Sequence, residues 1–180
     1  MTKSRFIVLL VLLTAGIRLF PHLPNFLPIT AICIFAGAHL GNKKHSLALI
    51  FVSMLISDMI LGLHSTMLFT YPALTLTVLL GSLLKKTSLV RRNHLNLNSI
   101  AELALVSVAG SLLFFTLTNF GVWLLQDLYS KDLAGLINCF VMALPFWKNS
   151  LQADVGYSVM FFTSYYLATK AIIANRSLCL

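Results

Sequence analysis

Apolar runs separated by short polar stretches make up most of the chain. Residues 133–147 form a weaker run, and the six stronger runs lie at about 6–20, 27–41, 47–63, 67–84, 100–118 and 150–170. A helix that crosses a bilayer needs roughly 20 apolar residues, within a range of about 17–25. The last four strong runs meet that length, and we expect the first two to borrow flanking residues. The pattern therefore predicts an all-α bundle of about six transmembrane helices.

The composition places this bundle in a membrane. Of 180 residues, 58% are hydrophobic and only 10% are charged, and the mean hydropathy is +0.89. A soluble domain of this length needs more charged surface than the sequence supplies. No polar linker is long enough to divide the chain, so we expect residues 1–180 to form a single transmembrane domain.

The distribution of basic residues predicts the orientation of the helices. The formal net charge is +8, but the basic residues lie in short clusters between apolar runs, as in membrane proteins, and not in a nucleic-acid-binding module. With six spans and both termini in the cytoplasm, ten of the 13 Lys and Arg residues lie on the cytoplasmic side: Lys3, Arg5, Lys43, Lys44, Lys85, Lys86, Arg91, Arg92, Lys170 and Arg176. A seventh span at 133–147 would move the last two outside. We therefore expect 133–147 to be a non-crossing segment on the outer face.

Two features of this topology stay open. The runs at 6–20 and 27–41 could form a hairpin that does not cross the membrane, which would leave four spans. Six spans are favoured because a hairpin would leave many apolar residues without an apolar environment. The segment at 133–147, within an expected outer loop at 119–149, is either a lid over a pocket or a re-entrant segment.

The residues least suited to a membrane gather at the outer ends of the expected helices. In "RLFPHLPNFLP", Pro21 and Pro24 stop the first helix, and Asn25 is placed to cap the second. Arg18 lies in the first apolar run and Asp58 in the third, at similar depth. Because a charge inside a membrane is costly, we expect a structural ion pair between them, with direct ligand contact as the alternative.

The expected outer loop at 119–149 combines aromatic and amide side chains. Asn119, Trp123 and Asn149 are among them. A belt of aromatic residues at the membrane surface would account for the tryptophans but not for the amides. Apolar walls with a few polar groups are typical of ligand pockets, so we favour a lid over a pocket that opens outward. Asp154 is interpreted as a partner for the N-terminal dipole of the last helix.

Metal and catalytic motifs are weak or missing. His22 and His64 lie at the expected outer rim, with Cys139 as a third candidate ligand. Two histidines and a cysteine can hold a metal, but no spacing motif supports such a centre, and Cys33, Cys139 and Cys179 form no CxxC pair. The sequence has no Walker A loop, HExxH or GxSxG motif. We therefore expect no bound metal, no cofactor and no catalytic residue.

Five stretches of the chain resemble a bacterial family of uncharacterised small membrane proteins. They are "RLFPHLPNFLPITA", "FAGA", "SDMILGLH", "NFGVW" and "LPFWKNSLQAD", and the resemblance runs from about residue 18 to about residue 160. The general layout is similar to that of the substrate-binding S subunits of energy-coupling-factor vitamin transporters. Those subunits have six helices, both termini inside, and a vitamin pocket near the outer face that loops close. The resemblance implies a bacterial plasma or inner membrane and an energising transporter module as a partner.

Our leading hypothesis is a membrane-embedded binding and uptake subunit for a small, vitamin-like micronutrient, with its site at the outer face. The expected ligand contacts are His22, Asn25, His64, Asn119, Trp123 and Asn149, with Arg18 and Asp58 holding two helices around the pocket. Membrane lipid is the expected surrounding, and neither nucleic acid nor enzymatic activity is expected. One alternative is a non-catalytic scaffold of a cell-envelope complex. Another is an intramembrane metal-handling protein or enzyme built on His22, His64 and Cys139.

Overall fold

The computed structural model describes residues 3–21, 23–40, 42–91 and 96–177, and every regular element in these ranges is helical. In these ranges six main helices carry the fold: α1 (Lys3–Ile17), α2 (Ile29–His39), α3 (Lys43–Leu61), α4 (Met67–Gly81), α6 (Leu97–Leu125) and α7 (Leu133–Ser177). A 3₁₀ turn, η1 (Ser82–Lys86), and the one-turn helix α5 (Ser88–Arg91) follow α4. The all-α class expected from the sequence is confirmed.

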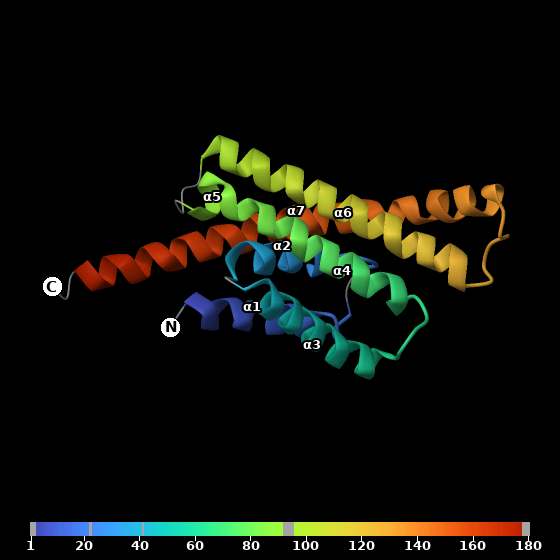
Figure 1. Ribbon diagram of the computed structural model, residues 1–180, viewed down its shortest axis with the longest axis horizontal. Coiled ribbons are helices and arrows are strands. Elements are labelled where there is room, and N and C mark those ends of the chain that lie inside the picture. The colour runs from blue at the N-terminus through green and yellow to red at the C-terminus, as the bar shows by residue number, and fades with distance from the viewer. Residues whose placement is uncertain (1–2, 22, 41, 92–95, 178–180) are drawn as a thin grey trace.

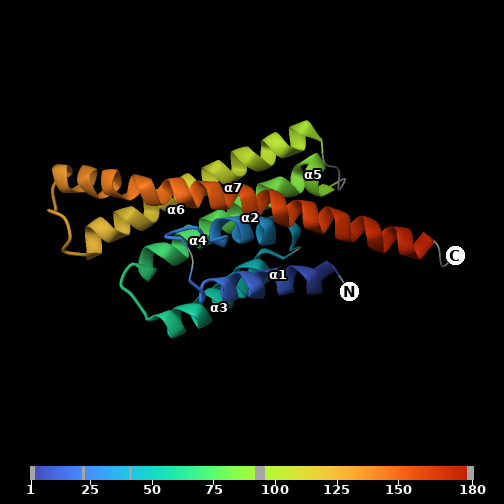
Figure 2. The same ribbon diagram turned by 180° about the vertical axis from the view of Figure 1, so that it is seen from behind.

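The main helices run along the long axis of the molecule and reverse direction from one to the next (Figures 1 and 2). Both termini lie at one end, together with α5 and the turn between α2 and α3. The α3–α4 and α6–α7 connections lie at the opposite end. The order and number of these helices match the six apolar runs of the sequence.

Fewer of the helices than expected are long and apolar enough to cross a membrane. In the described ranges three stretches qualify: Lys44–Leu61, Met67–Lys86 and Leu97–Leu125. With 15 and 11 residues, α1 and α2 reach only about 22 Å and about 16 Å at 1.5 Å per residue, against about 30 Å of hydrocarbon. In α7, polar residues such as Lys148, Gln152 and Asp154 interrupt the apolar pattern. Of these three residues, Asp154 is buried against neighbouring helices, whereas Lys148 and Gln152 are exposed. Neighbouring helices also bury α2.

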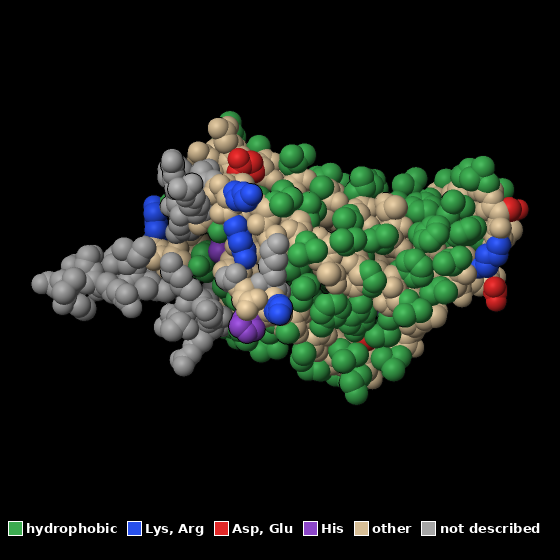
Figure 3. Space-filling view, viewed as in Figure 1, with side chains coloured by type: hydrophobic (Ala, Val, Ile, Leu, Met, Phe, Trp, Pro, Cys, Tyr) green, Lys and Arg blue, Asp and Glu red, His purple; other side chains and the backbone are tan. Residues whose placement is uncertain are grey.

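Helix α2 lies in the middle of the bundle. Its residues from Thr30 to Ala38 are all buried, and it packs against α4, α7, α1 and α6. A helix that is apolar on every side is stable only when other apolar groups surround it. The exposed large side chains lie instead on outer helices, for example Leu12 and Leu13 on α1 and Ile56 and Met59 on α3. Figure 3 shows that hydrophobic side chains cover much of one face of the molecule.

Two glycines let α2 and α4 approach each other closely. A Cβ atom on Gly37 would collide with the carbonyl oxygen of Val78 on α4, and a Cβ on Gly81 would collide with the backbone of Ile34 on α2. Small residues at a helix crossing allow this kind of backbone contact in membrane proteins. The crossing fixes the depth at which the short α2 helix begins.

The expected outer loop at 119–149 is mostly helix. α6 continues to Leu125, and α7 runs without interruption from Leu133 to Ser177, so only residues 126–132 connect them. The weak run at 133–147 is therefore the first part of α7 and is continuous with the expected helix at 150–170. Pro145 removes one backbone hydrogen bond but does not end the helix. At the start of α7, Asp132 Oδ1 accepts a hydrogen bond from the Gly135 N–H at 2.7 Å and so acts as an N-cap.

Candidate functional site: a cavity among the six main helices

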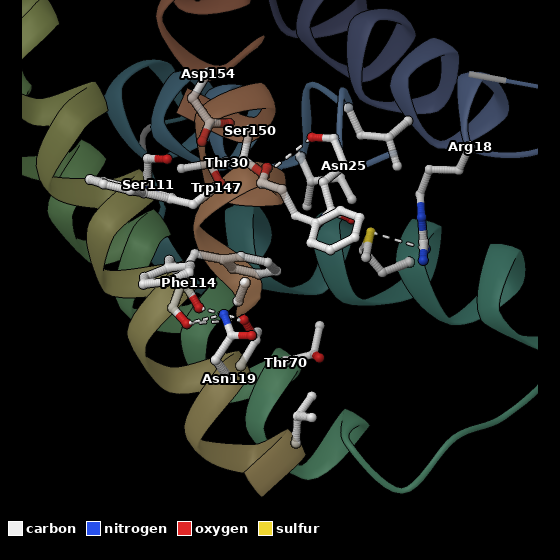
Figure 4. Close-up of a pocket in the computed structure, with 18 of the residues that line it drawn as sticks. Arg18, Asn25, Thr30, Thr70, Ser111, Phe114, Asn119, Trp147, Ser150 and Asp154 are labelled. Atoms are coloured by element: carbon white, nitrogen blue, oxygen red, sulfur yellow. Dashed lines mark hydrogen bonds between the residues drawn. The ribbon is translucent and has the colours of Figure 1, made fainter. Parts of the chain in front are cut away.

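A cavity of about 340 Å³ lies toward the end of the bundle that is opposite the termini. Each of the six main helices or the connection next to it contributes to its lining, as Figure 4 shows in part. Exposed residues of the α1–α2 and α3–α4 connections, Asn25 and His64, line its outer part. Buried residues of α2, α6 and α7 line its inner part, which we term the floor and define by Thr30, Ser111 and Asp154.

The connection between α1 and α2 brings irregular backbone to the cavity. Asn25 has φ 57°, in the left-handed region that asparagine tolerates better than most residues. Two hydrogen bonds from α7 hold this connection: Asn149 Nδ2 donates to the Pro24 carbonyl at 3.1 Å, and Ser150 Oγ donates to the Asn25 carbonyl at 3.2 Å. Non-helical backbone at membrane depth is stable only where protein buries it or where it lines a cavity.

An ion pair and its hydrogen bonds join the C-terminal end of α1 to α3 and α4 at one wall of the cavity. Arg18 Nη2 lies 2.7 Å from Asp58 Oδ1, and the two side chains are 12% and 3% exposed. Arg18 Nη1 donates to Ser57 Oγ, and Tyr71 OH on α4 donates to Asp58 Oδ2 at 3.0 Å. This is the pair that similar depth in the sequence suggested. The charges of Arg18 and Asp58 offset each other, so the wall carries little net charge.

The floor holds a carboxylate in the middle of α7. The side chains of Asp154 and Ser111 are each 2% exposed, and Asp154 Oδ2 and Ser111 Oγ have no hydrogen-bond partner among the described residues. Ser111 lies close enough to act on the carboxylate, as do Thr30 and the backbone N–H of Ala31 at the start of α2. Asp154 therefore faces the positive end of α2, and the interpretation that it serves the dipole of its own helix is wrong, because α7 begins at Leu133.

Aromatic side chains form an apolar wall beside the floor. Phe114, Phe115, Phe146 and Trp147 all line the cavity. The rings of Phe115 and Trp147 lie 5.2 Å apart between centroids. Trp147 Nε1 is buried and has no hydrogen-bond partner among the described residues. The cavity thus combines aromatic surface with a small number of polar atoms, as ligand pockets do.

The structure brings some of the expected contact residues together and places others elsewhere. Asn25, His64 and Asn119 line the cavity with Arg18. Trp123 and Asn149 are not among the described lining residues. Trp123 Nε1 donates to the Ser130 carbonyl at 2.9 Å, and so supports the α6–α7 connection; Asn149 holds the α1–α2 connection, as described above. His22 lies outside the described residues.

Sequence reasoning missed the floor. Trp147, Ser150 and Asp154 recur at intervals of three and four residues, and each lines the cavity from one face of α7. That spacing predicts a polar stripe on one helix face. It was available in the sequence, but only if 133–170 is taken as one helix. The position of Ser111 opposite Asp154 has no comparable local signal.

The residues proposed for a metal centre do not form one in the described part of the chain. No group of three or more His, Cys, Asp or Glu side chains is placed to hold a metal ion there. His64 lines the cavity, whereas Cys139 is not among its described lining residues, and its Sγ lies 3.5 Å from the Asn119 carbonyl.

These features define an all-helical protein with helices that could span a membrane and a partly polar cavity between them. The chain belongs to a family of unknown function (DUF6580), which it matches over residues 1–176. Comparisons with curated proteins and with solved structures find no match. The likeness to S subunits thus has no support from these comparisons and concerns layout alone.

Proposed function

We propose that this protein is a membrane-embedded subunit that binds a small micronutrient at the outer face of a bacterial plasma membrane and takes part in its uptake. The cavity carries this proposal. Its volume of about 340 Å³ falls near the lower end of the range for ligand pockets, about 300–1,000 Å³. A pocket of this size suits a ligand of one or two rings.

The distribution of charge supports an outward-facing cavity. Lys and Arg side chains gather at the end where both termini lie (Figure 3). Basic residues near helix ends favour the cytoplasmic side. At the opposite tip, Lys131 is accompanied by Asp127, whose Oδ1 lies 4.0 Å from Lys131 Nζ. The cavity lies toward that tip, and in the proposed topology its mouth therefore opens away from the cytoplasm.

Six passages are consistent with the short helices. The main helices alternate in direction along one axis (Figure 1). α2 starts at the cavity floor and needs to cover only the inner half of the membrane, because the α1–α2 connection covers the outer half. This arrangement resembles the broken helices of membrane transporters, which place helix ends beside a central binding site. An energising transporter module would supply the step that releases ligand to the cytoplasm.

A thermal-shift panel tests the proposal. Purified protein in detergent is heated with each of a set of vitamins, and a ligand at 100 times its Kd is expected to stabilise the folded state by about 2.7 kcal/mol. Ala143→Phe places a ring in the cavity and is expected to abolish the shift. Val141→Phe adds the same ring at an exposed position of α7 and is expected to preserve it.

Absence of stabilisation by every vitamin, or an equal loss of the shift in both variants, would contradict a binding function at this cavity. The scaffold alternative expects a closed surface without a cavity, so no observation favours it here.

A further inference from the structure

We infer that the floor of the cavity binds a positively charged nitrogen group of a small organic ligand, with Asp154 as its counter-ion. This inference rests on the proposed function and specifies the class of ligand. Figure 4 shows Asp154, Thr30, Ser111 and Trp147 gathered on one side of the cavity. They come from α7, α2 and α6, so the floor is assembled from segments distant in sequence.

Asp154 forms no ion pair with the described residues. Its side chain is 2% exposed, and Oδ2 accepts no hydrogen bond from described residues. A buried carboxylate without a cationic partner is strongly unfavourable, because water no longer solvates its charge. The carboxyl group avoids this penalty when it holds a proton, and a ligand that brings a cation to Oδ2 removes the penalty by stabilising the ionised form.

The nearby cation of the protein is already engaged. Arg18 pairs with Asp58 at 2.7 Å and lies across the cavity from Asp154 in Figure 4. The other ion pair of the described residues joins Lys131 to Asp127 in the α6–α7 connection. Neither ion pair includes Asp154.

The start of α2 offsets only part of the negative charge. A helix N-terminus is equivalent to about half a positive charge. Thr30 and the Ala31 N–H supply this effect at the carboxylate. With Asp154 ionised, a net negative charge therefore remains at the floor, and an anionic ligand group would be repelled from the helix end that Asp154 occupies.

The walls favour an organic cation over a metal ion. Trp147, Phe114 and Phe115 line the cavity, and aromatic faces attract ammonium and ring cations. Magnesium and calcium prefer several oxygen ligands, and the described residues contain no cluster of three acidic or His and Cys side chains. Trp147 Nε1, which has no hydrogen-bond partner among the described residues, can also donate to an acceptor atom of the same ligand.

A charge-matched panel tests the inference on the wild-type protein in detergent. Choline, thiamine and putrescine serve as cationic probes, and nicotinamide, biotin and pantothenate serve as neutral or anionic probes. We expect at least one cation to stabilise the protein, and we expect none of the other compounds to stabilise it to a similar extent. Choline is also compared with 3,3-dimethylbutan-1-ol, in which carbon replaces the charged nitrogen; at least tenfold weaker binding of the alcohol is expected if choline is the ligand bound.

Asp154→Asn keeps the size of the side chain and removes its charge. We expect it to weaken binding of the stabilising cation at least tenfold, while Asp127→Asn, the same change at an exposed residue of the α6–α7 connection, leaves binding unchanged. If Asp154→Asn does not fold, the preference of the wild type for cations decides the question.

The possible failures separate the two proposals. Stabilisation by a neutral or anionic probe, undiminished in Asp154→Asn, overturns the cationic ligand but keeps the binding function. Binding of a cation that is equally tight in Asp154→Asn also overturns it. Stabilisation by no member of either set refutes both.

Discussion

The crossing of α2 and α4 gives a direct test of the architecture that supports the cavity. A Cβ atom on Gly81 would lie 2.6 Å from the Cα and 2.8 Å from the carbonyl carbon of Ile34, whereas ordinary contacts begin at 3.4 Å. Gly81→Ala therefore forces the two backbones apart. The obstacle is backbone and not a flexible side chain, so it cannot rotate out of the way.

The expected cost follows from two opposing effects. Overpacking a tightly packed site costs about 1–3 kcal/mol, and the rigid obstacle places Gly81→Ala at the upper end. Replacing a helical glycine by alanine returns about 1 kcal/mol of helix propensity. The net loss is about 2 kcal/mol, and since 1 kcal/mol shifts Tm by about 2–4 °C in a chain of this size, Tm should fall by about 4–8 °C.

Unfolding in detergent can be followed with a thiol-reactive dye, because Cys33 and Cys139 are both buried in the folded protein. Gly156→Ala is the matched control: it makes the same change within α7, where a Cβ meets no described atom within 4 Å. We expect its Tm to be unchanged or higher, by up to about 4 °C, from helix propensity alone.

Equal Tm values for Gly81→Ala and Gly156→Ala would refute the close crossing. The position of the α2 N-terminus beside Asp154 would then lose its structural basis. A fall in Tm for both variants would instead indicate that alanine is unfavourable for reasons other than this contact.

Three further predictions concern the ion pair, the orientation and the start of α7. Asp58→Ala should lower stability by about 3–5 kcal/mol by leaving Arg18 unpaired in a buried site, while Asp58→Leu combined with Arg18→Met should recover most of the loss in thermal unfolding; no recovery would argue against pairing. A reporter enzyme that works only in the cytoplasm should be active when fused after Leu180. Activity of a reporter that works only outside the cytoplasm would reverse the proposed orientation. Hydrogen bonds from Gly135 and Ser130 lower the pKa of Asp132. The stability that ionised Asp132 gives the folded protein should therefore be complete above the ordinary carboxyl pKa and be lost as pH falls through the lowered pKa. In a curve of stability against pH, Asp132→Ala should reduce the loss of stability at acidic pH.

Part of the site was predictable from the sequence because a charge buried in a membrane needs a partner of opposite charge at similar depth. Arg18 and Asp58 each lie within an apolar run, and few other charges lie at that depth, so a pairing could be inferred before the helices were placed. Asn25, His64 and Asn119 were likewise selected as polar residues near one end of the expected helices, and all three line the cavity.

Other expectations failed where segment boundaries were wrong. A chain divided at 147–150 predicts a lid that contains Trp123 and Asn149 and a helix that starts just before Asp154. In the structure, α7 is continuous through Pro145, and the amide of Asn149 is used to hold the α1–α2 connection. A proline in a helix packed against other helices loses one hydrogen bond, and the surrounding contacts outweigh that loss.

The sequence by itself determined the helical class, the number and order of the main helices, and the membrane-like composition. These properties depend on local apolar runs and on the total supply of charge, both of which can be counted along the chain. Only the tertiary structure decided that the short α2 helix is wholly buried and that Asp154, Ser111 and Thr30 meet at one cavity floor. The lateral position of each helix depends on contacts between distant residues, such as Gly81 with Ile34, and hydrophobic burial has no direction of its own.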